Sequence, residues 1–174
     1  RQTTGDGRDI LSGIENVNGG GGNDIITGTR YANTLNGGNG NDTLNGGLGN
    51  DRLVGGGGID TALFSSRNNR INLGSTSRQN TGDGRDILTG IENINGGGGN
   101  DIITGSNSTN TLNGENGNDT LNGGLGNDSL NVGTTLSNSL LYGDSGADTF
   151  VIGGSLVGGS LFGGKSGNDS DGAD

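Results

Sequence analysis

The large apolar residues of this chain recur at one position in nine, in two stretches of the sequence. In most blocks Thr, Ser or Ile precedes the apolar residue and Thr or Asn follows it, which gives the alternation of a short β-strand. The remaining positions are mostly Gly, Asn and Asp, which are typical of tight turns. One turn and one strand in nine residues predict that two blocks complete a coil, with strands stacked 18 residues apart. The apolar residues would then form an internal ladder of Ile26, Leu35, Leu44 and Leu53, continued by Ile103, Leu112, Leu121 and Leu130.

A frame of the form G-G-x-G-x-D-x-U-x, with U a large apolar residue, underlies both stretches. It recurs from Gly19 to Leu63 and returns from Gly96 to Asn131. A longer repeat includes it, because residues 1–54 align without gaps on residues 78–131 and 44 of these 54 positions are identical. Such repeats are typical of solenoids, in which each unit contacts mainly its neighbours. The sequence begins inside a module, so we expect a piece of a longer tandem array.

The turn half of the frame suits a calcium ion. Glycines adopt positive φ without steric cost, so the backbone of a G-G-x-G-x-D turn can curl with its carbonyl oxygens inward. The aspartate adds a hard anionic oxygen, and a flexible cage of oxygens favours Ca²⁺ over Mg²⁺, which demands a tighter octahedron. Zinc would require Cys or His, and the chain contains neither. A single aspartate carries too little charge, so we expect two stacked turns to share one ion.

Seven blocks match this frame in register, and the chain thereby resembles the RTX (repeats-in-toxin) hemolysin-type calcium-binding nonapeptide repeats. The resemblance covers about half of the chain. It implies an all-β fold, a parallel β-roll or β-solenoid with several calcium ions between stacked turns. It also implies a secreted, extracellular or cell-surface protein, exported from Gram-negative bacteria through a one-step type I secretion channel.

The 18-residue stacking period predicts which ligands pair across the coils. Asp42 should face Asp24 on one side and Asp60 on the other, so that these two stand at the ends of an array. The same period pairs Asn33 with Asp51, Asp101 with Asp119, and Asn110 with Asp128. The metal candidates are therefore the carboxylates of Asp9, Asp24, Asp42, Asp51, Asp60, Asp86, Asp101, Asp119, Asp128, Asp148 and Asp169, the amides of Asn33 and Asn110 in weaker sites, and the backbone of Gly37, Gly40, Gly46, Gly114, Gly117 and Gly123.

The frame divides the chain into five parts. We expect the end of a linker insert at 1–18, a first calcium β-roll at 19–63, an inter-roll insert at 64–95, a second calcium β-roll at 96–151, and a diverged Gly/Ser-rich tail at 152–174. In the insert, residues 67–70 read as a polar turn and 71–73 as a strand, and Arg85 is a candidate ion-pair partner of Glu92. Residues 133–141 read as a diverged repeat with Asn138 in the place of Asn110. Residues 153–164 either continue the coil without metal or form a flexible end.

Composition and charge couple folding to the metal. With 43 glycines in 174 residues and 25% apolar residues, an aperiodic chain would be disordered. The net charge of −10 opposes compaction unless cations bind between the aspartates, so metal binding and folding should be one event. The basic residues are too few and scattered for a nucleic-acid footprint, and no apolar run is long enough to span a membrane. With no cysteine, calcium would replace the disulfides of other secreted domains.

These features favour a calcium-dependent structural or adhesive segment of a large secreted bacterial protein, such as a surface layer, an adhesin stalk or an extracellular filament. Calcium, copies of the chain itself and cell-surface components are the expected partners. The alternative is the C-terminal export and folding module of a type I-secreted enzyme or toxin, which the diverged repeat ending in Val151 favours. We expect no enzyme, since no His or Cys is present. Ice binding by an outward Thr and Asn ladder is disfavoured, because Val54 interrupts it.

Overall fold

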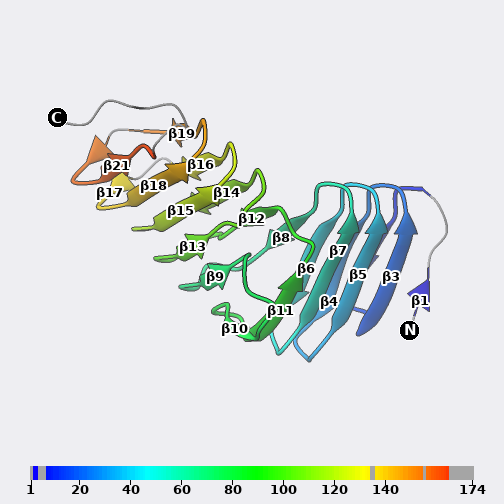
Figure 1. Cartoon of the computed structure of the whole chain (residues 1–174). Helices are drawn as coiled ribbons and strands as arrows, with labels where there is room; N and C mark the ends of the chain where they lie inside the picture. Colours follow the sequence, from blue (N-terminus) through cyan, green and yellow to red (C-terminus); the bar gives the residue numbers. More distant parts are fainter. Residues whose placement is uncertain (1, 4–6, 134–135, 155, 165–174) are drawn as a thin grey trace.

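The computed structural model describes residues 2–3, 7–133, 136–154 and 156–164. These residues form short β-strands joined by tight turns, and nearly all strand pairs are parallel, so the all-β solenoid expected from the sequence is confirmed. Figure 1 shows the strands stacked one after another along the length of the molecule. Among the described residues, no helix has the length and apolarity that crossing a membrane requires.

One parallel sheet of eight strands runs along the whole solenoid, and the strands between its members form the sheets that face it (Figure 1). The eight-stranded sheet contains β2 (Ile10–Ser12), β4 (Ile25–Thr29), β6 (Thr43–Gly47), β8 (Thr61–Leu63), β12 (Asn93–Asn95), β14 (Thr111–Glu115), β16 (Ser129–Val132) and β19 (Thr149–Ile152). A six-stranded sheet contains β1 (Gln2–Thr3), β3 (Asn16–Gly21), β5 (Thr34–Asn39), β7 (Arg52–Gly57), β11 (Arg85–Thr89) and β10 (Gln79–Asn80). A five-stranded sheet contains β9 (Arg70–Asn72), β13 (Ile102–Thr104), β15 (Thr120–Leu125), β18 (Leu140–Ser145) and β21 (Ser160–Phe162), and β17 (Leu136–Ser137) pairs with β20 (Leu156–Val157).

The register confirms the 18-residue coil. Leu35 pairs with Leu53 in the six-stranded sheet, and Ile26 pairs with Leu44 in the eight-stranded sheet. These side chains are fully buried, and most strands alternate buried and partly exposed residues along their length. Burial of a Leu or Ile side chain stabilises a fold by about 1.5–3 kcal/mol. The apolar position of the frame therefore supplies the core as a single internal ladder between two sheets.

The inter-roll insert does not interrupt the eight-stranded sheet. Strand β8 pairs directly with β12, and β7 pairs directly with β11, across the insert. Between these strands the chain steps forward to β9, which begins the five-stranded sheet and pairs with β13, and then steps back through β10 to β11 (Figure 1). The expected strand in the insert is confirmed as β9, preceded by a turn. The two rolls therefore share one continuous sheet, while the facing sheet changes from six strands to five at the insert.

Equivalent strands of the two 77-residue modules lie in opposite sheets. Strand β4 is in the eight-stranded sheet, whereas β13, its equivalent 77 residues later, is in the facing five-stranded sheet. Strand β5 is in the six-stranded sheet, whereas its equivalent β14 is in the eight-stranded sheet. The module therefore contains an odd number of half-coils, and corresponding residues of the two modules project from opposite sides of the core.

Within the second roll, from β15 onward, the coil lengthens from 18 to 20 residues. Thr120 pairs with Leu140, and Leu140 pairs with Ser160. This register places Ser139, rather than the expected Asn138, beside Asp119; the expectation that Asn138 takes the place of Asn110 is wrong, because the longer coil shifts the frame by one residue. Asn138 instead occupies an exposed turn at φ 64°. Strands β20 and β21 continue the coil through the described part of the tail, where the Tyr142 and Phe162 rings stack with centroids 4.7 Å apart.

Candidate metal centres

Acidic side chains form a ladder along the edge of the eight-stranded sheet, each next to the start of its strand. The backbone N–H of Asp9 donates to Oδ1 of Asp24, that of Asp24 to Oδ1 of Asp42, and that of Asp42 to Oδ1 of Asp60, all at 2.8 Å. The ladder continues across the insert, where the N–H of Asp60 donates to Oε2 of Glu92 at 2.9 Å. One carboxylate oxygen of each aspartate therefore binds the neighbouring coil. The ladder contains Asp9, Asp24, Asp42, Asp60, Glu92, Asn110, Asp128 and Asp148.

Two further ladders follow the same rule on the facing sheets. Along the six-stranded sheet, the N–H of Asn33 donates to Asp51, and that of Asp51 donates to Asp86, both at 2.7 Å. Along the five-stranded sheet, the equivalent bonds join Asn69 to Asp101 at 2.8 Å, Asp101 to Asp119 at 2.9 Å, and Asp119 to the hydroxyl of Ser139 at 2.9 Å. The pairs expected from the 18-residue period are stacked as predicted, but Asp24 and Asp60 are not array ends, because Asp9 and Glu92 extend their ladder.

In eight of the ladder aspartates, the second carboxylate oxygen is buried and has no hydrogen-bond partner. Buried polar atoms in folded proteins are almost always paired, and an isolated buried carboxylate is costly unless a cation neutralises it. A row of such atoms at equivalent positions in successive turns is therefore suited to bind cations. The atoms are Oδ2 of Asp24, Asp42, Asp51, Asp60, Asp101, Asp119, Asp128 and Asp148.

Glycine at the first position of each turn leaves room for this oxygen. A Cβ at Gly37 would fall on Oδ2 of Asp42, five residues later, although φ at Gly37 is ordinary. Around the Cβ position of Gly19 lie both Oδ2 of Asp24 and the carbonyl oxygen of Gly37 from the next coil, so side-chain and backbone oxygens converge there. The same cradle recurs at Gly46, Gly114 and Gly123, in front of Asp51, Asp119 and Asp128 respectively.

The third glycine of the frame brings stacked turns together. Gly40 and Gly117 have φ of +126° and +144°, and a Cβ on either would meet the carbonyl oxygen of Gly22 or Gly99 in the preceding coil. Among the described residues, no three acidic side chains converge on one point. The donor set at each turn is therefore a carboxylate oxygen with backbone carbonyls, which are hard oxygen ligands of the kind that calcium prefers. The residues fit calcium, and their roles as ligands remain predictions.

Burial raises the pKa of the ladder carboxyl groups. Desolvation, the largest cause, raises the pKa of Asp51 to about 7 and those of Asp60 and Asp101 to about 6. The hydrogen bonds from the neighbouring coil lower these values in part, and the nearest carboxylates of the same ladder raise them further. Without a cation these carboxyl groups would therefore stay protonated at pH values well above those at which an aspartate usually ionises. The pKa is also raised by burial at Asp24, Asp86, Asp119 and Asp128.

Turns with asparagine are closed by their own hydrogen bonds. Oδ1 of Asn33 accepts the backbone N–H of Thr29 at 2.7 Å, while its Nδ2 donates to the Thr29 hydroxyl at 3.2 Å. In the second module, Oδ1 of Asn110 accepts the backbone N–H of Ser106 at 2.6 Å, and its Nδ2 donates to the carbonyl of Glu92 at 2.8 Å. The amide groups of Asn33 and Asn110 thus have their hydrogen-bond partners within the protein, and weaker metal sites at these turns stay a prediction.

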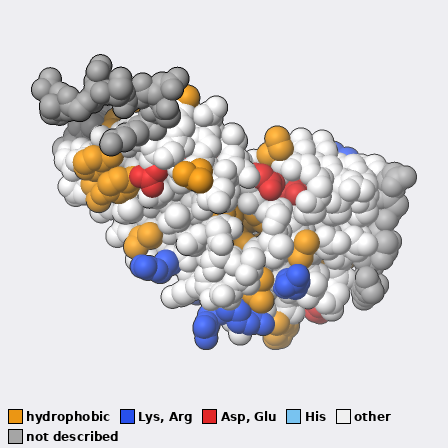
Figure 2. Space-filling model, in the orientation of Figure 1, with side chains coloured by type: hydrophobic (Ala, Val, Ile, Leu, Met, Phe, Trp, Pro, Cys, Tyr) orange, Lys and Arg blue, Asp and Glu red, His pale blue; other side chains and the backbone are white. Residues whose placement is uncertain are grey.

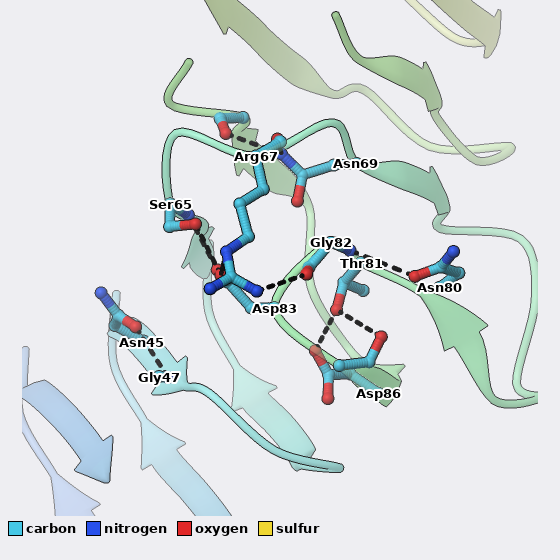
Figure 3. A network of polar contacts seen from close by, with 12 residues as sticks. Asn45, Gly47, Ser65, Arg67, Asn69, Asn80, Thr81, Gly82, Asp83 and Asp86 are labelled. Atoms are coloured by element: carbon cyan, nitrogen blue, oxygen red, sulfur yellow. Dashed lines mark hydrogen bonds and ion pairs between the residues drawn. The ribbon is translucent and has the colours of Figure 1, made fainter. Parts of the chain in front are cut away.

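The insert closes the Asp86 turn differently. Thr81 occupies the position of the first glycine, and its hydroxyl donates a very short hydrogen bond to Oδ2 of Asp86 (Figure 3). Asp83 anchors the other end of the insert, since its carboxylate accepts the N–H of Ser65 at 2.9 Å and also the Ser65 hydroxyl. Arg67 Nε lies 3.8 Å from Oδ1 of Asp83, which is the single ion pair within the described part of the chain. The expected Arg85–Glu92 pair is therefore not formed.

Three ladder positions were not expected from the sequence. Glu92 lies in the G-I-E-N segment directly before β12, and the repeated G-I-E-N itself was a signal that could have shown its place. Asn69 precedes β9 outside the nonapeptide frame, and its Oδ1 is buried without a partner. Ser139 was missed because of the longer coil. Asp169, also a predicted ligand, lies outside the described residues.

Comparison with known families gives one result. The model of the RTX calcium-binding nonapeptide repeat matches in four copies, over residues 12–30, 27–62, 88–121 and 95–130. These segments contain most of the stacked turns described above, but not residues 63–87 of the insert region or the tail. A search of curated proteins found no match. The matches extend over more than half of the chain, and the protein therefore belongs to the family of RTX calcium-binding nonapeptide repeat proteins.

Proposed function

We propose that this chain is a calcium-folded spacer, a structural or adhesive segment of a larger secreted bacterial protein. Its repeats bind calcium, as those of its family do. The ions would lie between stacked turns, held by the free Oδ2 atoms and the adjacent glycine carbonyls. A spacer needs an axis that transmits force without a flexible break. The observation that carries the proposal is the eight-stranded sheet, which passes the insert without interruption.

Electrostatics make calcium necessary for this rod. The ladder carboxylates of successive coils are stacked directly on one another, so each ionised group faces like charges within its own ladder. Binding of divalent cations between them would replace this repulsion with attraction and would satisfy the buried Oδ2 atoms at the same time. The apolar core is only one side chain wide. We therefore expect the metal-free chain at neutral pH to be expanded.

Circular dichroism and small-angle X-ray scattering during a calcium titration test this function. Calcium should convert an expanded chain into a rod with β-structure, and magnesium at equal concentration should not. Optical-tweezers unfolding should then show a mechanical resistance that appears with calcium and extends across the insert. A compact radius that is unchanged by calcium, or a calcium-loaded chain that bends freely at the insert, would refute the spacer function.

A second candidate is the C-terminal export and folding module of a type I-secreted enzyme or toxin. One observation favours it: from β15 onward the coil lengthens to 20 residues, and the carboxylate position of the five-stranded sheet's ladder is taken by Ser139 and then Gly159. The loss of carboxylates from successive turns would suit the C-terminal end of a calcium roll. A slowly refolding passenger fused upstream would refold faster in calcium if this candidate holds, and at an unchanged rate if the chain is only a spacer. We propose no catalytic role for either candidate.

A further inference from the structure

The positive charge outside the calcium turns gathers at the insert. Apart from the turn aspartates, the described residues contain seven arginines and five acidic side chains, so arginine outnumbers acid on the part of the surface away from the turns. Four of the seven arginines fall within residues 67–85. Figure 2 shows Lys and Arg side chains gathered on the face where β9, β10 and β11 lie in Figure 1.

A polar hollow of about 310 Å³ lies within this basic region. Ligand pockets typically occupy about 300–1,000 Å³, so the hollow suits a single small polar group. Arg70 is exposed at its wall, and within the described part of the chain its guanidinium has no carboxylate partner. The lining includes Arg70, Asn72, Ser75, Gln79, Asn80 and Ile102.

The walls of the hollow are fixed by hydrogen bonds that leave Arg70 available. The side-chain amide of Gln79 accepts the backbone N–H of Asn72 at 2.6 Å and donates to its carbonyl at 3.0 Å, so it covers the free edge of β9 as a neighbouring strand would. Arg78 donates to the carbonyl of Arg85 at 3.0 Å, which ties the start of the β10–β11 hairpin. These hydrogen bonds thus fix the shape of the hollow, and the guanidinium of Arg70 is free to bind a ligand.

We propose that this hollow binds an anionic saccharide unit, carrying a carboxylate or a sulfate, of an extracellular polymer. The guanidinium of Arg70 would bind the anionic group with paired, charge-assisted hydrogen bonds. Amide and hydroxyl side chains around it both donate and accept, as the hydroxyl groups of a sugar require. An acidic peptide fits less well, since the hollow offers no deep apolar pocket for a side chain. This inference rests on the proposed calcium-driven fold.

The walls of the hollow come from the insert and the second roll, and the insert is itself held by strands of both rolls, so binding depends on calcium. Strand β9 is held by pairing with β13 of the second roll, and Ile102 and Thr104 of β13 line the hollow. The segment carrying Gln79 is held through β10 and β11 by β7 of the first roll. If either roll loses its calcium and unfolds, the two walls separate. The anionic polymer would thus be bound only by the loaded chain.

Binding of defined trisaccharides to the full chain tests the proposal. A uronate, a sulfated and a neutral trisaccharide are titrated in calcium and again with chelator, by isothermal calorimetry, and circular dichroism reports whether the chain is folded in each sample. We expect one or both anionic sugars to bind in calcium, none to bind in chelator, and the neutral sugar not to bind. Arg70→Gln should weaken binding about tenfold, the loss of one charge-assisted contact. Affinity should also fall with added salt.

Arg30→Gln is the matched control, because Arg30 is an exposed arginine outside the insert whose guanidinium contacts Tyr31. If Arg70→Gln and Arg30→Gln lost saccharide affinity equally, the loss would reflect only the change in net charge, and the assignment of the hollow would be overturned. No binding by a chain that folds normally in calcium would also overturn it, while the spacer function would stand. Tetraglutamate binding as tightly as the anionic sugars would assign the hollow to acidic peptides instead. A chain that fails to fold in calcium would refute the spacer function itself.

Discussion

The backbone N–H of Asp24 donates a hydrogen bond of 2.8 Å to Oδ1 of Asp42, one coil further along, and the Oδ2 atom of the same carboxylate is buried without a partner. Most ladder aspartates thus have one oxygen for the neighbouring coil and one left for a cation. The first oxygen sets the register between coils, and the second makes that register depend on the metal.

Replacing Asp42 should cost more than replacing Asn33, the equivalent amide of the preceding half-coil. Asp42→Ala removes the acceptor for the N–H of Asp24 and a free carboxylate oxygen in the middle of the ladder. Asn33→Ala removes an amide whose oxygen is already bonded to Thr29. Isothermal titration should show fewer calcium ions bound by Asp42→Ala and nearly the wild-type number by Asn33→Ala. Equal stoichiometry in the two variants would contradict the assignment of Oδ2 as a ligand.

The first glycine of the turn is predicted to be a calcium determinant on steric grounds. In Gly37→Ala the new Cβ would fall on Oδ2 of Asp42, and such overpacking typically costs about 1–3 kcal/mol. Gly57→Ala is the control: φ is ordinary there too, and the nearest atom is the exposed side chain of Asn39 at 3.3 Å. Thermal unfolding in calcium should separate the two variants clearly. Similar midpoints would show that the cradle has no steric role.

Calcium binding should release protons near pH 6. The folded-state pKa of Asp51 is about 7 and those of Asp60 and Asp101 are about 6, above the unfolded value of 3.8. Their contribution to the stability of the metal-free fold is thus fully present below pH 3.8 and is lost as the pH rises through 6 and 7. Calcium-depleted chain should therefore show more β-structure by circular dichroism at pH 4.5 than at pH 7.5. Calcium affinity should rise over the same interval, and calorimetry in buffers of different ionisation enthalpy would count the protons.

Thr81→Gly should add a calcium site. The hydroxyl of Thr81 donates to Oδ2 of Asp86, the oxygen that is free in the other aspartate turns. Glycine at position 81 would restore the G-G-x-G-x-D frame and leave that oxygen for a cation shared with the Asp51 turn. Titration should show a higher calcium stoichiometry than in the wild type. Thr81→Ser, which keeps the hydroxyl, should not change it.

Truncation of a core-ladder residue, which occurs once in nine residues, should destabilise the fold strongly. Leu121 is fully buried in β15, whereas Leu125 of the same strand is 50% exposed. Leu121→Ala should lower the free energy of unfolding in calcium by about 2–5 kcal/mol, the usual range for a large core residue. Leu125→Ala should change it by less than about 0.5 kcal/mol. Chemical denaturation at saturating calcium would measure both, and comparable losses would show that the core extends beyond the ladder.

Sequence periodicity was sufficient to predict the strands, the core and the stacked pairs, because every block repeats the same local chemistry. Leu44 and Asp42 lie where a nine-residue count places them. The path of the insert could not be predicted in this way, since β11 pairs with β7 over 35 residues and β12 with β8 over 32. These offsets arise where the chain leaves the nonapeptide frame, and the contact of Asp83 with Ser65 that anchors the loop lies outside that frame.

The exchange of sheets between modules has a consequence for any longer array of this repeat. Sequence and structure then have different periods, and two modules make one translational unit of the fibre. A feature encoded once per module, such as the arginine hollow beside β9, would be presented alternately on two opposite sides. Such a fibre would be two-sided, able to bridge polymer strands lying on either flank. A module with an even number of half-coils would instead present this feature on the same side of the fibre in every repeat.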